Sequence, residues 1–281
     1  MMPLRASGRP AVAPTTTQPD PALPSRGPKL RSTTRRRFGA AFTSGADTYR
    51  SVRPSYPDDA VDFLLQGHGP QRGSVVELGA GSGQLTQKLL LRGYQVEATE
   101  PSAGMLETLR EHLCSYPQLG THRVSAEDTA LPAGQATAVV AAQAWHWFDV
   151  DRATHEAARL SQPGARLGLI WNQLDVTHPW VHRLSRIMHA GDVHGIDWRP
   201  PITPGYYNAP EMFHTYWSQQ LTADGIVALA QTRTYWLNAN PQTRQRVEEN
   251  IRWYLSEELG FDQDATIELP YRCSALRANL R

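Results

Sequence analysis

The stretch Ser-Val-Val-Glu-Leu-Gly-Ala-Gly-Ser-Gly, residues 74–83, decides the fold of this 281-residue chain. Its first half, residues 74–78, is a short β-branched run typical of a strand that is buried on both faces. Its second half spaces three glycines as G-x-G-x-G, so the backbone can turn sharply and a ligand can approach it closely. Residues 84–91 then predict a helix that ends near Gly93. The stretch therefore predicts a strand, a glycine turn and a helix, with a ligand at the turn.

Similar units recur along the chain. Short apolar runs predict five strands, at residues 74–78, 94–100, 121–125, 138–142 and 166–171. Helices are predicted between most of them, at residues 84–91, 102–113 and 153–160, and another, opened by Pro57, precedes the first strand. Strands that alternate with helices form a mostly parallel sheet covered on both faces. Right-handed crossovers then bring the carboxyl ends of the strands, and any ligand, to one edge of the sheet.

The C-terminal third is less regular. Asn240 and Pro241 open a helix predicted to end at Leu259, and residues 265–274 predict a last strand. Between them and the sheet, residues 178–217 are rich in aromatic side chains, namely Trp180, Trp198, Tyr206, Tyr207, Phe213 and Trp217. This segment is either a cap over a small organic ligand or a packed accessory layer.

Charge divides the chain in two. Residues 1–38 hold eight Lys and Arg residues and a single acid, which leaves 20 of the 28 basic and 26 of the 27 acidic residues, a net charge of about −6, in residues 39–281. We expect a disordered basic tail at 1–38 and one folded domain at 39–281. The acidic domain is a poor match for a nucleic acid, so no nucleic-acid partner is expected.

Nothing in the sequence predicts a membrane segment or a metal site. No apolar run approaches the roughly 18 residues that span a bilayer, and no short apolar leader with a cleavage site stands near the start. The two cysteines, Cys114 and Cys273, lie far apart and fit no metal-ligand spacing. A reducing cytoplasm is the expected location, with no obligate protein partner.

Two acidic residues flank the glycine turn. Glu77 ends the first strand, and Glu100 ends the second, 21 residues after Gly79, where nucleoside-binding α/β domains place an acid for the ribose hydroxyls. A dinucleotide site would need a further glycine at position 84, which is Gln84. The pattern suits a nucleoside joined to an amino acid, whose positive charge Glu77 balances. Gln84 and Glu77 therefore disfavour a nicotinamide-dependent oxidoreductase.

These residues belong to a longer set of motifs, through which the sequence resembles the class I S-adenosylmethionine-dependent methyltransferases. Within that family it is similar to the branch related to trans-aconitate methyltransferase. The matching segments are residues 49–57, 77–83, 100–106, 126–132, 142–149, 171–172 and 269–272, and the resemblance spans about residues 38–275. The basic tail lies outside the pattern, and Trp145 stands where Phe is more usual.

The resemblance implies a doubly wound, Rossmann-like sheet of seven strands, the last antiparallel, with S-adenosyl-L-methionine as the cofactor. The glycine loop would hold the methionine part, Glu100 the ribose, residues 126–127 the adenine, and Gln143 would lie beside the methionine. Tyr49 and Arg53, one helical turn apart, would close over the cofactor and pair with its carboxylate; alternatively they are a packed tyrosine and a surface arginine. The full cofactor set is Tyr49, Arg53, Glu77, Gly79, Ala80, Gly81, Gly83, Glu100, Met105, Ala126, Glu127 and Gln143.

The methyl acceptor is expected beyond the fourth strand. His146 is the candidate base, or else a structural imidazole, while Trp147, Trp171 and Asn172 are candidate substrate contacts or core residues. We expect a small-molecule acceptor that is methylated on a carboxylate, which needs no base, or on a hydroxyl, which does. RNA methylation and a binding module without catalysis are the alternatives.

Overall fold

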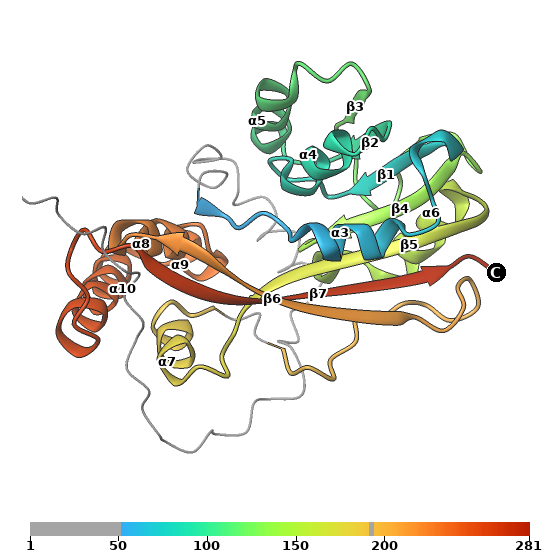
Figure 1. The fold of residues 1–281 in the computed structure, drawn as a ribbon. Coiled ribbons are helices and arrows are strands. Elements are labelled where there is room, and N and C mark those ends of the chain that lie inside the picture. The colour runs from blue at the N-terminus through green and yellow to red at the C-terminus, as the bar shows by residue number, and fades with distance from the viewer. Residues whose placement is uncertain (1–51, 191–193) are drawn as a thin grey trace, which may run out of the picture.

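The computed structural model describes residues 52–190 and 194–281, and its centre is a seven-stranded sheet in the order β3-β2-β1-β4-β5-β7-β6 (Figure 1). The strands are β1 (Ser74–Leu78), β2 (Val96–Thr99), β3 (Leu119–His122), β4 (Ala136–Ala142), β5 (Ser161–Leu174), β6 (Glu211–Leu221) and β7 (Ile267–Asn279). Strands β1 to β5 are parallel, and β7 runs antiparallel to both β5 and β6. The prediction of a mostly parallel seven-stranded sheet is confirmed.

Helices cover both faces of this sheet. They are α3 (Asp58–Leu65), α4 (Gln84–Leu91), α5 (Ala103–Leu113), α6 (Val150–Leu160), α7 (Pro179–Ile187), α8 (Ala223–Gln231), α9 (Thr234–Asn238) and α10 (Pro241–Trp253). Short turns η2 (Pro70–Arg72), η3 (Trp145–Trp147) and the π-helical η4 (Tyr254–Glu258) complete the set. Successive strand residues point to opposite faces, so Val75 packs with α3, α4 and α5, whereas Val76 packs with α6.

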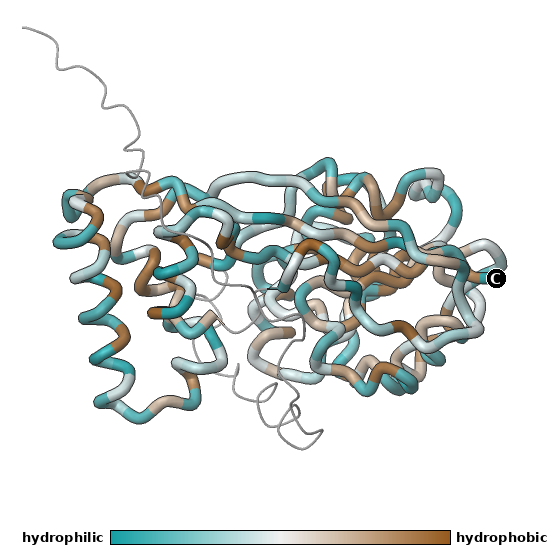
Figure 2. Tube along the Cα trace, turned by 90° about the horizontal axis from the view of Figure 1, so that it is seen from below, coloured by the Kyte–Doolittle hydropathy of each residue, from teal (hydrophilic) through white to brown (hydrophobic). Residues whose placement is uncertain are grey.

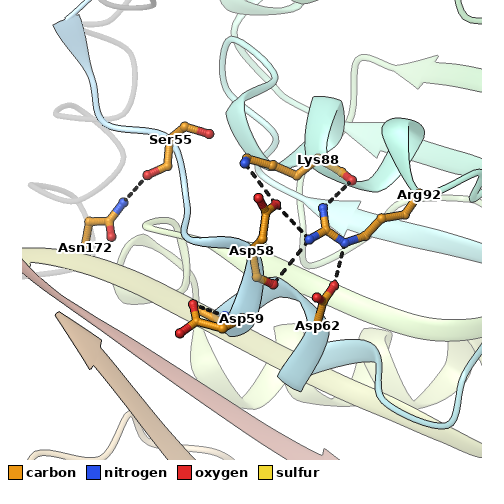
Figure 3. A network of polar contacts seen from close by, with 8 residues as sticks. Ser55, Asp58, Asp59, Asp62, Lys88, Arg92 and Asn172 are labelled. Carbon is orange, nitrogen blue, oxygen red and sulfur yellow. Dashed lines mark hydrogen bonds and ion pairs between the residues drawn. The ribbon is translucent and has the colours of Figure 1, made fainter. Parts of the chain in front are cut away.

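An ion-pair network fixes α3 beside α4 (Figure 3). Asp58 accepts from Lys88 Nζ at 3.0 Å and from Arg92 Nη2 at 2.8 Å, and Asp62 accepts from Arg92 Nε at 2.7 Å. Pairs this exposed add little stability each. Their consequence is positional, because α3 carries the preceding segment, residues 53–57, past the carboxyl ends of the strands.

A second core lies at one end of the molecule, where α7, α8 and α10 pack on the extended ends of the long strands (Figure 1). It includes Leu174 of β5, Leu184 of α7, Leu229 of α8, Ile251 of α10 and Tyr271 of β7, all of them buried. Hydrophobic residues lie along the strands of the sheet and at intervals along the helices at this end (Figure 2). The second core thus joins the C-terminal helices to the sheet.

The structure divides the segment predicted as a cap, residues 178–217, between helix α7, a loop and strand β6. Phe213 and Trp217 belong to β6, an edge strand of the sheet, and the helices at this end come from residues 179–187 and 223–258. The strand was not predicted from the aromatic composition of residues 206–217, because aromatic residues are common in strands as well as in ligand pockets.

The other predicted elements are present, some of them with shifted ends. The strand at residues 74–78 and the helix at 84–91 match β1 and α4 to the residue. The third strand, expected at 121–125, runs from Leu119 to His122, because Ser125 turns back to pair with Asp128. The helix expected to run from Pro241 to Leu259 changes to a π-helical turn at Tyr254.

Across residues 52–190 and 194–281, no helix combines the length and the apolar character that a bilayer crossing requires.

The second core generates a stability prediction. Ile251 is fully buried in it, so Ile251→Ala should lower the free energy of unfolding by about 2–4 kcal/mol, because the substitution removes apolar contacts and leaves a cavity. Urea denaturation followed by circular dichroism measures this change. The control is Asn250→Ala on the exposed side of the same helix, which should cost less than about 0.5 kcal/mol. Equal, small effects of both substitutions would contradict the packing of α10.

Candidate active site

A cleft opens at the carboxyl edge of the sheet, where β1, β2, β4 and β5 end. Its walls come from the segment before α3 (Arg53, Pro54, Tyr56), the glycine loop (residues 79–82), the end of β2 (Glu100, Pro101), residues 142–144 and 147–148 after β4, and Asn172 of β5. Glu77, Gln84, Leu85 and Met105 complete the lining. The sheet topology predicted a ligand site at this edge, and the cleft lies there.

The glycine loop needs its glycines for two different reasons. Gly79 has a φ of +71°, and a Cβ there would stand 2.8 Å from the Cβ of Ala144, so no other residue fits. Gly81 also has a positive φ, +56°, but a Cβ there would meet nothing within 4 Å. The backbone at Gly81, a residue of the cleft lining, is therefore open to a ligand.

Glu100 holds this loop in place. Its Oε2 accepts the N–H of Gly81 at 3.0 Å, and its Oε1 accepts the N–H of Ser102 at 2.8 Å. The side chain is buried, which raises the pKa of its carboxyl, while the two N–H donors oppose that rise. One carboxylate thus connects the glycine loop to the start of α5.

Glu77 is the more deeply buried acid, with 1% of its surface exposed. Thr86 donates to its Oε2 at 2.6 Å, and no described residue hydrogen-bonds its Oε1. Burial raises the pKa of Glu77 to about 8. The nearby Glu100 adds to this rise, and the hydrogen bond from Thr86 opposes it. A buried carboxylate oxygen without a partner is costly, so it marks a place where a ligand donor belongs.

Gln143 follows β4 in a left-handed conformation, with a φ of +52°, which is rare for a residue with a side chain. Its Nε2 donates to the carbonyl oxygen of Asn172 at 2.7 Å, and its buried Oε1 has no hydrogen-bond partner among the described residues. Because the Asn172 bond fixes the amide, Gln143 presents an acceptor oxygen. Such strain next to a cleft is typical of a functional position.

Asn172 lines the cleft, but its own amide already joins three parts of the fold. Its Nδ2 donates to the Ser55 carbonyl oxygen at 2.9 Å (Figure 3), and its Oδ1 accepts from Trp217 Nε1 at 3.2 Å. It therefore ties β5 to the segment before α3 and to β6. This arrangement supports a structural role at least as well as the predicted substrate contact.

The structure brings together most of the predicted cofactor residues. Arg53, Glu77, Gly79, Ala80, Gly81, Glu100, Met105 and Gln143 line one cleft, together with Trp147 from the predicted substrate set. Gly83, in a left-handed conformation, caps the start of α4. Tyr49 lies outside the described residues.

Besides Gly83, four predicted site residues in the described part of the chain do not line the cleft. Trp171 is 2% exposed and packs edge-to-face on Trp198 in the core, because alternation along β5 turns Asn172, not Trp171, toward the cleft side. This placement does not support a substrate contact by Trp171. Ala126 is buried in the same core, and Glu127 Oε1 accepts the N–H of Asp149 at 3.0 Å.

His146 is the fourth of these residues. It occupies the middle of the 3₁₀ turn η3, next to Trp147, with 4.7 Å between the two ring centroids. Three residues per turn send neighbours in different directions, so Trp147 lines the cleft whereas His146 does not.

Nine lining residues were not predicted as site residues, and two of them, Tyr56 and Phe148, are aromatic. Both lie inside segments matched to the family, 49–57 and 142–149, and the signal that could have found them is their position beside other candidate residues. Within the described part of the chain, His, Cys, Asp and Glu side chains form no group that could hold a metal ion.

The residues of the cleft fit a cation that carries hydroxyl groups. An oxygen of Glu77 lacks a partner, Glu100 keeps spare lone pairs on both oxygens, and the backbone at Gly81 is open. Two acids beside a glycine loop disfavour a pyrophosphate, because like charges repel.

Comparison with known proteins agrees with this geometry. The family model described as "Methyltransferase domain" matches residues 76–169. An uncharacterised methyltransferase of Mycobacterium tuberculosis is 34% identical over 247 residues, which cover 88% of this chain and 98% of that protein. An uncharacterised methyltransferase of Schizosaccharomyces pombe is 28% identical over 60% of this chain and 68% of its own length.

Among solved structures, that of a type II methyltransferase candidate from Anaeromyxobacter dehalogenans superposes with a TM-score of 0.57, at 23% identity over 81% of this chain and 96% of that chain. That likeness concerns the fold. The relatives and the family model show that this chain belongs to the class I S-adenosylmethionine-dependent methyltransferases. It is a methyltransferase, and its cofactor is S-adenosyl-L-methionine.

The pKa of Glu77 generates a prediction for the cofactor-free protein. The ordinary pKa of this carboxyl is 4.5, and in the folded protein it is about 8. At a pH between these two values, Glu77 therefore keeps its proton in the folded protein and releases it in the unfolded chain. The contribution of Glu77 to the free energy of unfolding is fully present below about pH 4.5 and is lost as the pH rises through about 8. The free energy of unfolding should therefore fall from pH 5 to pH 8.5 more steeply for the native protein than for Glu77→Gln. Urea denaturation at each pH measures both slopes, with Glu107→Gln, an exposed acid of α5, as control. Parallel slopes for the native protein and Glu77→Gln would contradict the raised pKa.

Proposed function

We propose that this protein transfers the methyl group of S-adenosylmethionine to an oxygen of a small-molecule acceptor, either a carboxylate or a hydroxyl. One observation carries the proposal: the cleft is a pocket of about 170 Å³, and a narrow hollow adjoins it beside the second core. This inner hollow shares Arg53, Pro54, Gln143 and Asn172 with the cleft and adds Gln173, Leu174, Ala190, Leu229, Arg233 and Tyr271. A cleft of this size suits a small molecule, and the net acidic charge of residues 39–281 disfavours RNA.

Each acid of the cleft has a distinct part in holding the cofactor. Glu100 accepts the two ribose hydroxyls on the lone pairs that the N–H groups of Gly81 and Ser102 leave available. The unpartnered oxygen of Glu77 and that of Gln143 face donors of the amino-acid part. When bound, S-adenosylmethionine supplies a methyl group on a positively charged sulfur. The protein aligns the two reactants and keeps water out.

The acceptor atom follows from the groups that line the cleft. An ionised carboxylate needs no base, whereas a neutral hydroxyl must lose a proton. The described residues of the cleft lining include no His, Lys or Cys side chain. A carboxylate acceptor therefore fits the site better, and His146 would serve a hydroxyl acceptor only if the turn η3, in which it lies, moved.

The motifs at residues 49–57, 100–106 and 142–149 support a place in the branch related to trans-aconitate methyltransferase. Domain organisation follows the same proposal, with a basic tail at 1–38 and a methyltransferase domain at 39–281, whose boundary lies outside the described residues. The predicted cap at 178–217 contributes Ala190 to the wall of the inner hollow.

The role of Glu100 can be tested by substitution. Glu100→Ala should weaken S-adenosylmethionine binding at least about tenfold, because charge-assisted hydrogen bonds contribute about 1.5–3 kcal/mol each. The melting temperature without ligand should also fall, since Gly81 and Ser102 lose their acceptor. Calorimetric titration and thermal unfolding measure the two effects. Glu107→Ala, an exposed acid of α5, is the control. An unchanged affinity would refute the assignment of Glu100.

The acceptor class can be tested with methyl-labelled S-adenosylmethionine, incubated separately with a small-metabolite extract and with total RNA. Label should enter low-mass products, and mild alkali should release it, because methyl esters hydrolyse and methyl ethers do not. Transfer should change little between about 50 and 200 mM salt, whereas binding to a nucleic acid would weaken by orders of magnitude. Label in RNA that is lost at high salt or on deletion of residues 1–38 would overturn the proposal. Low-mass label that resists alkali would assign a hydroxyl acceptor. The variant His146→Asn would then test whether His146 is the base.

A further inference from the structure

The segment before α3 joins the two cores of the molecule. Val52, at its start, is buried in the second core, and Tyr56 is buried in the core that the sheet forms with α3, α4 and α5. Arg53, Pro54 and Tyr56 line the cleft. Residues 52–56, which we call the strap, are therefore a short bridge between two cores that also forms one wall of the cleft.

Polar side chains of β5 and β6 hold one side of the strap. Gln219 Nε2 of β6 donates to the carbonyl oxygen of Val52 at 3.0 Å. Asn172 Nδ2 of β5 donates to the carbonyl oxygen of Ser55 at 2.9 Å (Figure 3), and Asn172 Oδ1 accepts from Trp217 Nε1 at 3.2 Å. Trp217 and Gln219 are two residues apart on β6, so they lie on the same face of the sheet. An edge strand, none of whose residues lines the cleft, thus positions one of the cleft walls.

The other side of the strap is held from α4, which begins directly after the glycine loop. Gln84, the first residue of α4, donates through Nε2 to the carbonyl oxygen of Arg53 at 3.3 Å. Arg53 Nη2 donates to the carbonyl oxygen of Thr232, at the end of α8, at 2.9 Å. Residues 53–57 belong to no helix or strand, and Pro54 has no N–H to donate. The strap is therefore held by side-chain hydrogen bonds and not by a strand ladder.

The size of the cleft requires that one wall moves when the cofactor binds. The cleft holds about 170 Å³, whereas sites for small organic ligands usually hold roughly 300–1,000 Å³. The strands on either side of the glycine loop are fixed by the ladder of the sheet. The strap is fixed by amide–carbonyl bonds, each of which is weak because water can replace either partner. It is the wall that can open without unfolding either core.

We propose that the strap is the gate through which S-adenosylmethionine enters and leaves the cleft, and that Gln219 is a positioning residue that holds this gate closed. The gate must open both for the empty protein to bind the cofactor and for the complex to release it. Loss of the Gln219 hydrogen bond should therefore raise the rates of binding and of release by the same factor and leave the equilibrium affinity nearly unchanged. A residue that only supports the bound site would change release alone. Because the gate acts on the cofactor, it does not depend on the identity of the methyl acceptor.

Gln219→Met tests the gate, because it keeps the length of the side chain and removes the N–H donor. Dissociation is followed by chasing methyl-labelled S-adenosylmethionine from the full-length protein with an excess of the unlabelled compound. Equilibrium titration gives Kd, and the two values together give the association rate constant. Both rate constants should rise about three- to tenfold, while Kd stays within about twofold of the native value. Unchanged rate constants, or a faster release that Kd follows in proportion, would overturn the proposal.

Two further variants keep this test decisive. Gln220→Met is the matched control, since Gln220 is the next residue of β6 and is exposed on the opposite face. It should leave both rate constants unchanged, and an effect equal to that of Gln219→Met would contradict the gate. Trp217→Phe removes the N–H that Asn172 accepts and keeps a ring against Tyr271, so it tests the gate if Gln219→Met does not fold. It should raise both rate constants as well, and unchanged values there would also overturn the proposal.

Discussion

The hydrogen bond from the Gly81 N–H to Glu100 is the interaction on which the site depends. It joins the loop after β1 to the end of β2, so these two neighbouring strands also set the walls of the cleft. The loop can adopt this path only because Gly79 packs against Ala144 without a side chain. A single substitution at Gly79 would therefore disturb the ligand site through the backbone and not through a lost contact.

Charge explains why this loop suits a cation. Burial makes ionised Glu77 unfavourable in the free protein, and a positive ligand group nearby would reverse that preference. The inner hollow has the opposite character, since Arg53 and Arg233 line it.

Sequence patterns predicted the sheet and most of the cofactor cleft, because both depend on local features: β-branched runs, glycine spacing and acids at strand ends. They failed where a position depends on distant packing. Strand alternation sends Trp171 into the core and Asn172 to the cleft, and the 3₁₀ turn separates His146 from Trp147. Arg233 could not be found from the sequence, because only the packing of α8 on β5 and β7 brings it to the hollow.

The glycine loop and its two acids should select a cationic nucleoside joined to an amino acid over a dinucleotide. Isothermal titration of the native protein with S-adenosylmethionine and with NAD, at the same pH and salt, tests it most directly. We predict one site per chain for S-adenosylmethionine and at least about a hundredfold weaker binding of NAD, a difference of about 2.8 kcal/mol. Equal affinities, or a preference for NAD, would contradict the claim.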